Sequence, residues 1–191
     1  MHKKIKAFFS LIICILIYHI LTITNIYNPY VLPPLKDIVF SFVELIKDKS
    51  LIINIFVSLK RVFFGFFISF LFASTFAILE YRCRKFIAYY DWFLQFMRNI
   101  PPLSLIPLLI LWFGIGETSK LIIIILASFF PMYLNFEKGL LCCDPKLIEV
   151  GKVFNFSNKK IFLKIILPNA LPDILVGLRL GLGYSYRAII G

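Results

Sequence analysis

The feature that most constrains this chain is a series of apolar blocks of about 20 residues, the length that a helix needs to span a hydrocarbon core about 30 Å thick. Hydrophobic residues make up 60% of the 191 residues and charged residues only 16%. Soluble domains have about 45–50% apolar and about 25% charged residues. The chain is therefore predicted to be an all-α, polytopic transmembrane helix bundle.

Five membrane spans are predicted from these blocks and from the polar residues and prolines between them. The third is the least regular, because Asp91 and Arg98 interrupt it, and the pair Pro101-Pro102 predicts a kink inside it. The fifth begins near Leu171 and is still apolar at Gly191. The predicted spans are residues 7–26, 62–79, 86–113, 121–136 and 171–191.

Residues 35–46 have a different pattern, with apolar side chains at helical spacing and charged side chains between them. Such a helix can lie in the membrane interface with its apolar face toward the lipid. It can equally be a helix in a loop outside the membrane. The pattern predicts the helix and leaves both positions open.

The distribution of lysine and arginine predicts the orientation, because cytoplasmic loops carry an excess of these residues. With the N-terminus in the cytoplasm, twelve such residues lie on the inner side and at most six on the outer side. The segment 137–168 is then cytoplasmic. The twelve are Lys3, Lys4, Lys6, Arg82, Arg84, Lys85, Lys138, Lys146, Lys152, Lys159, Lys160 and Lys164.

The composition does not favour nucleic-acid binding, metal binding, a disulfide framework or histidine-based catalysis. The net charge of +11 sits in short loops between apolar blocks, as membrane topology requires, rather than in a patch for nucleic acid. The four cysteines form no C-x-x-C pair, and there are only two histidines, His2 and His19. We therefore expect no metal site, no disulfide framework and no histidine-based catalysis.

The predicted cytoplasmic segment contains the clearest local signals in the chain. Asp144 can cap a helix, and Pro145 suits its first position, where the missing N–H has no partner to lose. A helix is predicted over residues 145–154, followed by Asn155 in the left-handed conformation and by Ser157 as the cap of a second helix.

This helix is predicted to be amphipathic. An apolar and small-residue stripe is opposed by charged residues, so the helix can dock into a groove of a partner protein. It can also pack back on its own bundle, and the residues alone do not decide between the two. The stripe consists of Leu147, Ile148, Val150, Gly151 and Phe154, and the charged residues are Lys146, Glu149 and Lys152.

The segment resembles the cytoplasmic loop of ABC importer permeases, whose pattern is Glu-Ala-Ala, then Gly four residues later, Ile ten residues after that and Leu-Pro. The spacing fits Glu149-Val150-Gly151, Asn155, Ile165 and Leu167-Pro168. Three identities depart from the pattern. Val150 and Gly151 replace the alanines, and Asn155 replaces the glycine, for which asparagine is the next best residue in the left-handed conformation.

Further motifs in the same order extend the resemblance over roughly residues 30–191. They are similar to the permeases for nitrate, aliphatic sulfonates, taurine and thiamine precursors within the binding-protein-dependent transport inner-membrane family. The motifs are Arg98-Asn99-Ile100-Pro101-Pro102, Leu111-Trp112-Phe113-Gly114-Ile115-Gly116-Glu117, Phe129-Phe130-Pro131 with Asn135, and Leu167-Pro168-Asn169-Ala170-Leu171-Pro172 before Gly177-Leu178-Arg179.

The resemblance implies a single permease domain over residues 1–191, incomplete before a sixth span, in a bacterial inner membrane. It also implies a homodimeric channel, a cytoplasmic ABC ATPase subunit and a periplasmic or lipid-anchored solute-binding protein. The ATPase subunit would bind the ATP, and this chain has no G-x-x-x-x-G-K-[ST] phosphate loop. The permease itself would be no enzyme and need no cofactor.

The implied function is import of a small, anionic solute such as a sulfonate, taurine, nitrate or a thiamine precursor. The alternative is a membrane-embedded scaffold or enzyme unrelated to ABC transport, and a paired-carboxylate or histidine-rich site inside the membrane would favour the enzyme. The residues implied in coupling to the ATPase are Pro145, Leu147, Ile148, Glu149, Val150, Gly151, Phe154 and Asn155.

Two features of the last block have more than one interpretation. Arg179 lies at membrane depth, where it can attract an anionic substrate in a translocation pathway, extend toward the cytoplasmic face or pair with Asp173. Gly177-x-x-x-Gly181 provides a face for close helix packing, either within the bundle or in a dimer.

Overall fold

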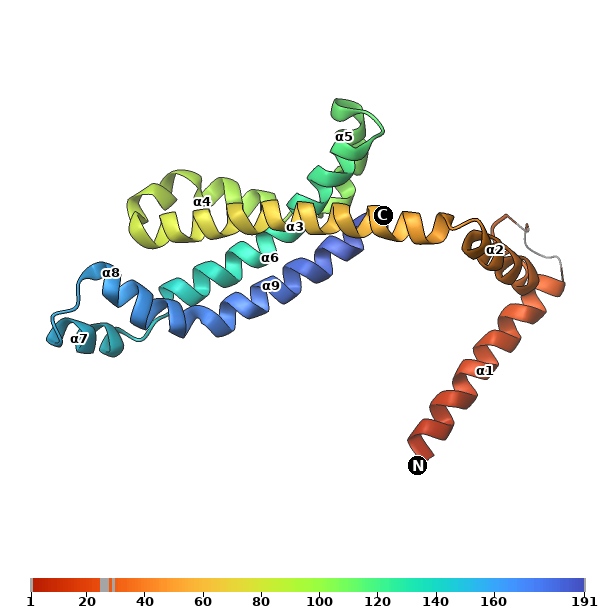
Figure 1. The fold of residues 1–191 in the computed structure, drawn as a ribbon, viewed down its shortest axis with the longest axis horizontal. Helices are drawn as coiled ribbons and strands as arrows, with labels where there is room; N and C mark the ends of the chain where they lie inside the picture. The colour runs from red at the N-terminus through yellow and green to blue at the C-terminus, as the bar shows by residue number, and fades with distance from the viewer. Residues whose placement is uncertain (1, 25–27, 29, 191) are drawn as a thin grey trace. The chain divides into compact units, whose positions relative to one another are not determined.

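The computed structural model describes residues 2–24, 28 and 30–190, and in this part of the chain all regular structure is helical. The chain divides into two compact units, residues 1–57 and 58–191, which are described separately. Helix α3 (Ser50–Arg82) begins in the first unit and continues in the second. Figure 1 labels the longer helices.

The first unit contains α1 (His2–Ile23) and α2 (Leu35–Lys47). The predicted span 7–26 corresponds to α1, whose apolar stretch Phe8–Ile23 is shorter than the other spans. Residues 25 and 26 of the prediction lie outside the described residues. The predicted amphipathic helix is confirmed as α2. None of its residues is buried, and its position relative to the membrane stays a prediction.

Four spans of the prediction fall in the second unit and correspond to long apolar helical segments there. Three are single helical runs of membrane-spanning length, namely α3, α6 (Glu117–Leu141) and the run Asn158–Ile190. The fourth is a bent pair, Tyr89–Arg98 with Pro102–Phe113. The shorter elements of the unit are α4 (Arg84–Arg98), η1 (Pro102–Leu105), α5 (Ile106–Phe113), α7 (Pro145–Val153), α8 (Asn158–Ile161), the π-helical turn η2 (Phe162–Ile166) and α9 (Leu167–Ile190).

The predicted kink in the third span is a complete break. The two halves of the bent pair enclose an angle of 90°. Pro101 and Pro102 have no N–H, and the chain turns there into η1, whose start is closed by a hydrogen bond from Ser104 Oγ to the Pro101 carbonyl at 2.6 Å. The prolines therefore separate two helices that point in different directions.

The last predicted span, which begins near Leu171, lies within a longer helical run. The helical run begins thirteen residues earlier, at Asn158, and continues through Pro168 and Pro172 to Ile190. In η2 the Leu167 N–H bonds to the Phe162 carbonyl, five residues back. This wider turn gives room to the ring of Pro168, which would clash with a carbonyl in a regular helix.

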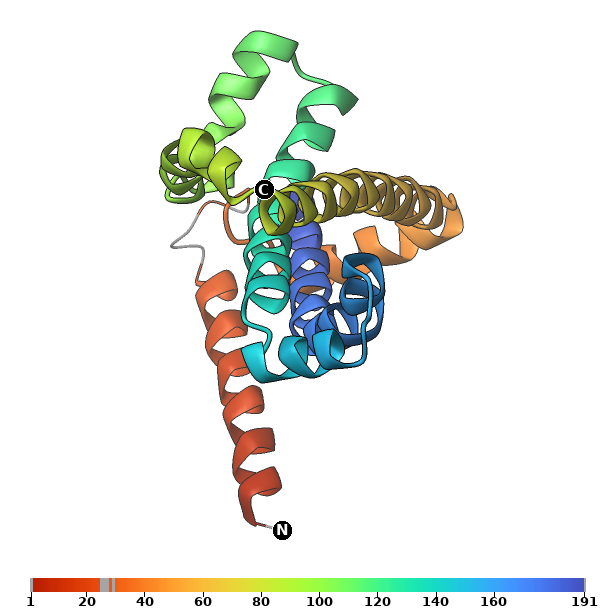
Figure 2. The same ribbon diagram turned by 90° about the vertical axis from the view of Figure 1, so that its left-hand side faces the viewer.

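Helices α6 and α9 lie side by side and antiparallel, as Figures 1 and 2 show. Small residues on α9 let the backbones approach closely. A Cβ added at Gly177 would lie 2.9 Å from Asn135 Cβ, and one at Gly181 would lie 2.6 Å from Met132 Cγ. The Gly177-x-x-x-Gly181 face is thus used within the bundle, which settles the alternative left open by the sequence.

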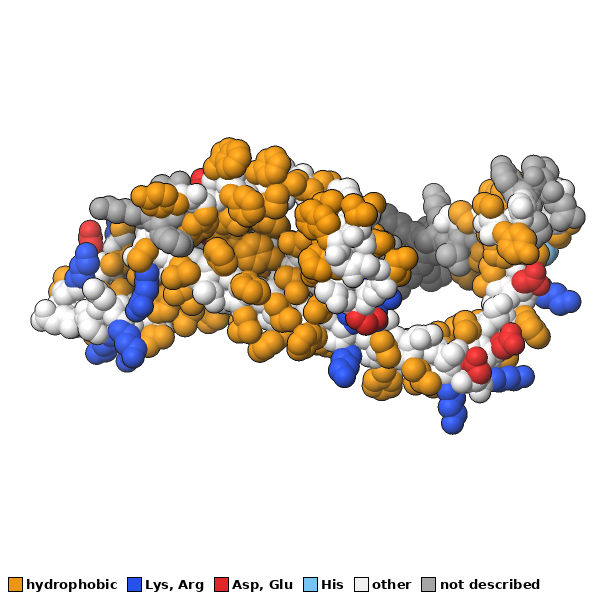
Figure 3. Space-filling view, turned by 90° about the horizontal axis from the view of Figure 1, so that it is seen from above, with side chains coloured by type: hydrophobic (Ala, Val, Ile, Leu, Met, Phe, Trp, Pro, Cys, Tyr) orange, Lys and Arg blue, Asp and Glu red, His pale blue; other side chains and the backbone are white. Residues whose placement is uncertain are grey.

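Helix α3 packs on α6 through a similar close contact, since a Cβ at Gly65 would lie 2.7 Å from Ile124 Cγ2. The opposite face of α3 exposes large apolar side chains. In the view of Figure 3, hydrophobic side chains cover most of the visible surface of the second unit. Lys and Arg side chains lie together at the end that carries α7 and α8. With lipid as solvent such a surface is expected. The exposed residues of α3 include Phe63, Phe64, Phe67, Leu71 and Phe72.

Candidate functional site

Helix α7 is specified at both ends by the residues that the sequence indicated. Asp144 Oδ1 accepts a hydrogen bond from the Lys146 N–H at 2.9 Å, and Pro145 occupies the first turn. At the other end, Asn155 has a φ of 53°, so its predicted left-handed conformation is confirmed. Helix α7 ends at Val153, one residue before the predicted end.

Two backbone hydrogen bonds close the C-terminal end of α7. The Phe156 N–H bonds to the Gly151 carbonyl at 3.0 Å, and the Asn155 N–H bonds to the Lys152 carbonyl at 2.9 Å. This pair is the Schellman motif, which satisfies carbonyls that a helix end leaves without partners. Ser157 then caps α8 by accepting a hydrogen bond from Lys160 N–H, as predicted. Helix α7 is thus a short, rigid element.

One edge of α7 packs on the chain's own bundle. Gly151 is buried, and a Cβ there would lie 2.6 Å from Ile165 Cδ1 and 3.2 Å from Ile161 Cγ1. Ile148 is half-buried on the same edge. Two residues of the loop motif, Gly151 and Ile165, together with Ile161, therefore connect α7 to the beginning of the long helical run Asn158–Ile190.

The rest of the apolar stripe is exposed. The exposed fractions are 44% for Leu147, 51% for Val150 and 67% for Phe154. Pro145, Glu149 and Asn155 are exposed as well, and no ion pair of Glu149 occurs within the described residues. Helix α7 therefore combines the two possibilities left open by the sequence, an edge that packs inward and an apolar surface that faces outward. We call Leu147, Val150 and Phe154 the outer patch.

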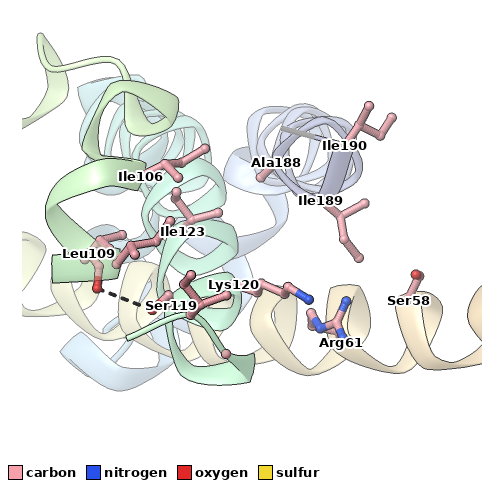
Figure 4. Close-up of a pocket in the computed structure, with 13 residues that line it drawn as sticks. Ser58, Arg61, Ile106, Leu109, Ser119, Lys120, Ile123, Ala188, Ile189 and Ile190 are labelled. Atoms are coloured by element: carbon pink, nitrogen blue, oxygen red, sulfur yellow. Dashed lines mark hydrogen bonds between the residues drawn. The ribbon is translucent and has the colours of Figure 1, made fainter. Parts of the chain in front are cut away.

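A cavity lies at the opposite end of α6 from α7, with a volume of about 340 Å³. Figure 4 shows Arg61 and Lys120 at its edge, with Ile189 and Ile190 of α9 nearby. Arg61 donates two hydrogen bonds to the Glu117 carboxylate, Nε to Oε2 at 2.7 Å and Nη2 to Oε1 at 2.5 Å. Glu117 also lies 3.8 Å from Lys120 Nζ, so one carboxylate partly compensates the charges of two cations at this end.

The structure places Arg179 on α9 with its side chain exposed. The interpretation that it pairs with Asp173 is wrong, because Lys138 Nζ donates to Asp173 Oδ1 at 2.9 Å instead. Lys138 is on α6, and the pair therefore links the two packed helices. The residues that line the cavity beside Arg61 do not include Arg179. Its role in a translocation pathway stays a prediction.

A buried polar cluster was missed from the sequence, because the second predicted span ends at residue 79 and leaves Glu80 outside it. Glu80 is only 3% exposed and accepts a hydrogen bond from Tyr133 Oη at 2.6 Å. Glu137, one turn after Tyr133 on α6, lies close enough to Glu80 for the two carboxyl groups to interact. The spacing of Tyr133 and Glu137 by four residues was the available signal, because it puts both on one helix face.

Comparison with known proteins gives matches over most of the chain. The family described as "Binding-protein-dependent transport system inner membrane component" matches residues 65–191. The "Putative aliphatic sulfonates transport permease protein SsuC" of Bacillus subtilis is 36% identical over 178 residues, which cover 93% of this chain and 64% of that relative. The chain thus spans less than two thirds of the length of this relative.

Two further relatives show similar identity. A "Putative ABC transporter permease protein" of Methanocaldococcus jannaschii is 32% identical over 182 residues, covering 93% of this chain and 68% of the relative. The taurine transport system permease protein of Escherichia coli is 30% identical over 168 residues, covering 85% of this chain and 61% of the relative.

Proposed function

The chain belongs to the family of inner-membrane components of binding-protein-dependent transport systems, and from this premise we propose that it is the permease subunit of an ATP-driven importer. It is a multi-pass membrane protein by family and by its apolar helices. Its partners would be a cytoplasmic ABC ATPase subunit, a solute-binding protein and a second copy of the permease. ATP would be bound by the ATPase subunit.

The observation that carries this proposal is the arrangement of α7. A helix fixed at both ends presents the outer patch of Leu147, Val150 and Phe154, with Glu149 among these residues. Exposed apolar residues on a rigid helix can act as anchors in a groove of a partner. We assign this surface to the ATPase subunit, with α7 on the cytoplasmic side of the membrane.

The buried edge of α7 offers a path for force into the membrane. Gly151 contacts Ile161 and Ile165, which belong to the helical run Asn158–Ile190. That run packs along α6 through Gly177 and Gly181. A displacement of α7 by the ATPase would therefore move the α6–α9 pair, which is the kind of bistable element that a partner can bias.

A small anionic solute is the proposed substrate, with a sulfonate as the first candidate. Two relatives are named for aliphatic sulfonates and for taurine, both of which contain a sulfonate group. The enzyme alternative gains no support from Glu80 and Glu137. Glu80 is almost completely buried and bonded to Tyr133, and neither carboxyl lines the cavity beside Arg61.

Replacement of Glu149 tests the coupling role. In the complete transport system reconstituted in lipid, Glu149→Lys should reduce ATP hydrolysis stimulated by the loaded solute-binding protein by more than about tenfold, because a charge reversal in a protein interface costs several kcal/mol. Membrane insertion and assembly of the permease should be normal. Lys159→Glu is the matched control, since Lys159 is exposed on α8 outside the outer patch.

A second variant, Val150→Asp, places a charge in the centre of the outer patch and should have the same effect. Full stimulation in both Glu149→Lys and Val150→Asp would show that the ATPase docks elsewhere. Loss of stimulation in Lys159→Glu to the same extent would show that the effect reflects general surface charge rather than a contact of α7.

A further inference from the structure

A second cavity of about 520 Å³ lies within the second unit, between the break at Pro101-Pro102 and the packed helices α6 and α9. Its lining is mainly apolar, with four polar side chains, Arg98, Asn99, Asn135 and Tyr184. Binding sites for small molecules typically have this composition, a largely apolar wall with a few polar groups that fix orientation.

The cavity lies inside the membrane-spanning part of the bundle. Its α6 wall extends from Leu126 to Asn135, within a helix that runs from Glu117 to Leu141. With a rise of 1.5 Å per residue, this wall begins about 14 Å from one helix end and stops about 9 Å from the other. Arg98, the last residue of α4, is therefore a cation at membrane depth.

Unlike Arg61 and Lys138, Arg98 forms no salt bridge within the described residues, and it attracts the Glu137 carboxylate only from beyond salt-bridge distance. Arg61 pairs with Glu117, and Lys138 pairs with Asp173. Within the described residues, no Asp or Glu oxygen lies within salt-bridge distance of the Arg98 guanidinium. A charge at this depth is costly unless it faces a cavity or a partner, and Arg98 lines a cavity of sufficient size for a small solute.

The two amides beside Arg98 are held in fixed positions. Asn99 Nδ2 donates to the Gln95 carbonyl at 2.7 Å, and Asn135 Nδ2 donates to the Pro131 carbonyl at 2.7 Å. These bonds occupy amide N–H groups with helix carbonyls. Each amide keeps its second N–H. The guanidinium of Arg98, with a positive charge and five N–H donors in a planar fork, is the cavity's principal donor toward an anion, and the Tyr184 hydroxyl and these amide N–H groups can add to it.

We propose that this cavity binds the anionic group of the transported solute, with the Arg98 guanidinium as its ionic partner. The inference rests on the proposed import function and deepens it, because it assigns a place in the membrane where the sulfonate group is held. The cavity beside Arg61 is less suited to this task, since Glu117 already neutralises that guanidinium.

The test uses thiol reagents that differ in charge. Asn135→Cys places a thiol in the cavity of the permease, expressed with the rest of its transport system in native membranes. The probes are the methanethiosulfonates with an ethylsulfonate and with an ethyltrimethylammonium group. Cys142 in the same chain is the internal reference, because it is exposed, whereas burial raises the pKa of the neighbouring Cys143 thiol and reduces its thiolate fraction.

The cavity thiol should react about tenfold faster with the anionic reagent than with the cationic one, relative to Cys142, since a cleft lined by one sign of charge raises the local counter-ion concentration at least this much. Arg98→Gln should abolish the preference. Arg82→Gln is the matched control and should retain it, because Arg82 is exposed at the end of α3 and is not part of the cavity wall. Ethanesulfonate at saturating concentration should slow the modification.

Equal rates for the two reagents, or a preference that survives Arg98→Gln, would overturn the proposal. If Asn135→Cys does not assemble, Tyr184→Cys places the thiol on the α9 wall and should give the same result. A preference for the anionic reagent in a system that takes up no sulfonate would leave the anion site standing and reject the proposed substrate. Uptake of sulfonate without any charge preference would reject only the site.

Discussion

Glu80 stands at the end of an apolar block, next to Arg82, in a position where the sequence indicates the membrane boundary and an exposed side chain. The structure instead buries it against Tyr133 of α6. A buried carboxyl group is tolerated because it is hydrogen-bonded, and its partner is 53 residues away in the chain. This single contact ties α3 to α6 at the end of the bundle from which α7 follows.

At the residue scale, Tyr133→Phe should destabilise the permease by about 1–3 kcal/mol, the cost of leaving a buried polar group without its donor. The measurement is the thermal unfolding midpoint in detergent. Tyr81→Phe is the matched control, because Tyr81 contacts the Phe162 ring at a centroid distance of 5.2 Å, a contact that phenylalanine preserves. An equal shift in the two variants would contradict the role of the Glu80 hydrogen bond.

At the scale of elements, the sequence predicts best what is decided locally. The caps of α7 depend on Asp144, Pro145 and Asn155, which act within a few residues, and the structure has all three as expected. The sequence did not predict that the last helix begins at Asn158, before both Pro168 and Pro172. The widened turn of η2 that accommodates Pro168 has no signal in a simple count of apolar residues.

The candidate site was only partly predictable, because the sequence indicates local features and not tertiary contacts. The amphipathic pattern of α7 indicated its apolar residues, but which edge packs inward follows from Ile161 and Ile165, more than one helical turn further along the chain. The sequence indicated Arg98 only as an interruption of the third span and as part of a motif. Its place in a cavity depends on Asn135 of α6 and Tyr184 of α9, and so on the tertiary packing of three segments.

The packing of α6 against α9 gives a prediction at this scale. Gly181→Ala puts a Cβ 2.6 Å from Met132 Cγ, whereas a Cβ at Gly183, two residues away on the same helix, meets nothing within 4 Å. Alanine is favoured over glycine in a helix by about 1 kcal/mol, and overpacking costs about 1–3 kcal/mol. Gly183→Ala should therefore raise the thermal midpoint, and Gly181→Ala should lower it or leave it unchanged. A rise of equal size in both would show that α6 and α9 do not pack closely at Gly181.

At the scale of the whole molecule, the two ends of α6 differ in the charged residues that lie near them. Its Leu141 end leads to Cys142 and α7, around which Lys146, Lys152, Lys159, Lys160 and Lys164 are all exposed. Its Glu117 end follows the turn at Ile115, where Arg61 and Lys120 share the carboxylate of Glu117. Uncompensated positive charge is therefore concentrated at the α7 end, which the positive-inside tendency places in the cytoplasm.

This orientation can be tested with two sites that flank α6, a helix of 25 residues and about 37 Å in length. Ile115 is 90% exposed beyond the Glu117 end, and Cys142 is exposed at the other end. In intact spheroplasts, a membrane-impermeant maleimide should label Ile115→Cys and not Cys142, and permeabilisation should make Cys142 reactive, with each site read by peptide mass spectrometry. Labelling of Cys142 from outside would put α7 on the wrong side for an ATPase, because ATP is available only in the cytoplasm. The outer patch would then need a partner outside the cell, while the contacts of Gly151 with Ile161 and Ile165 would still connect that partner to the membrane helices.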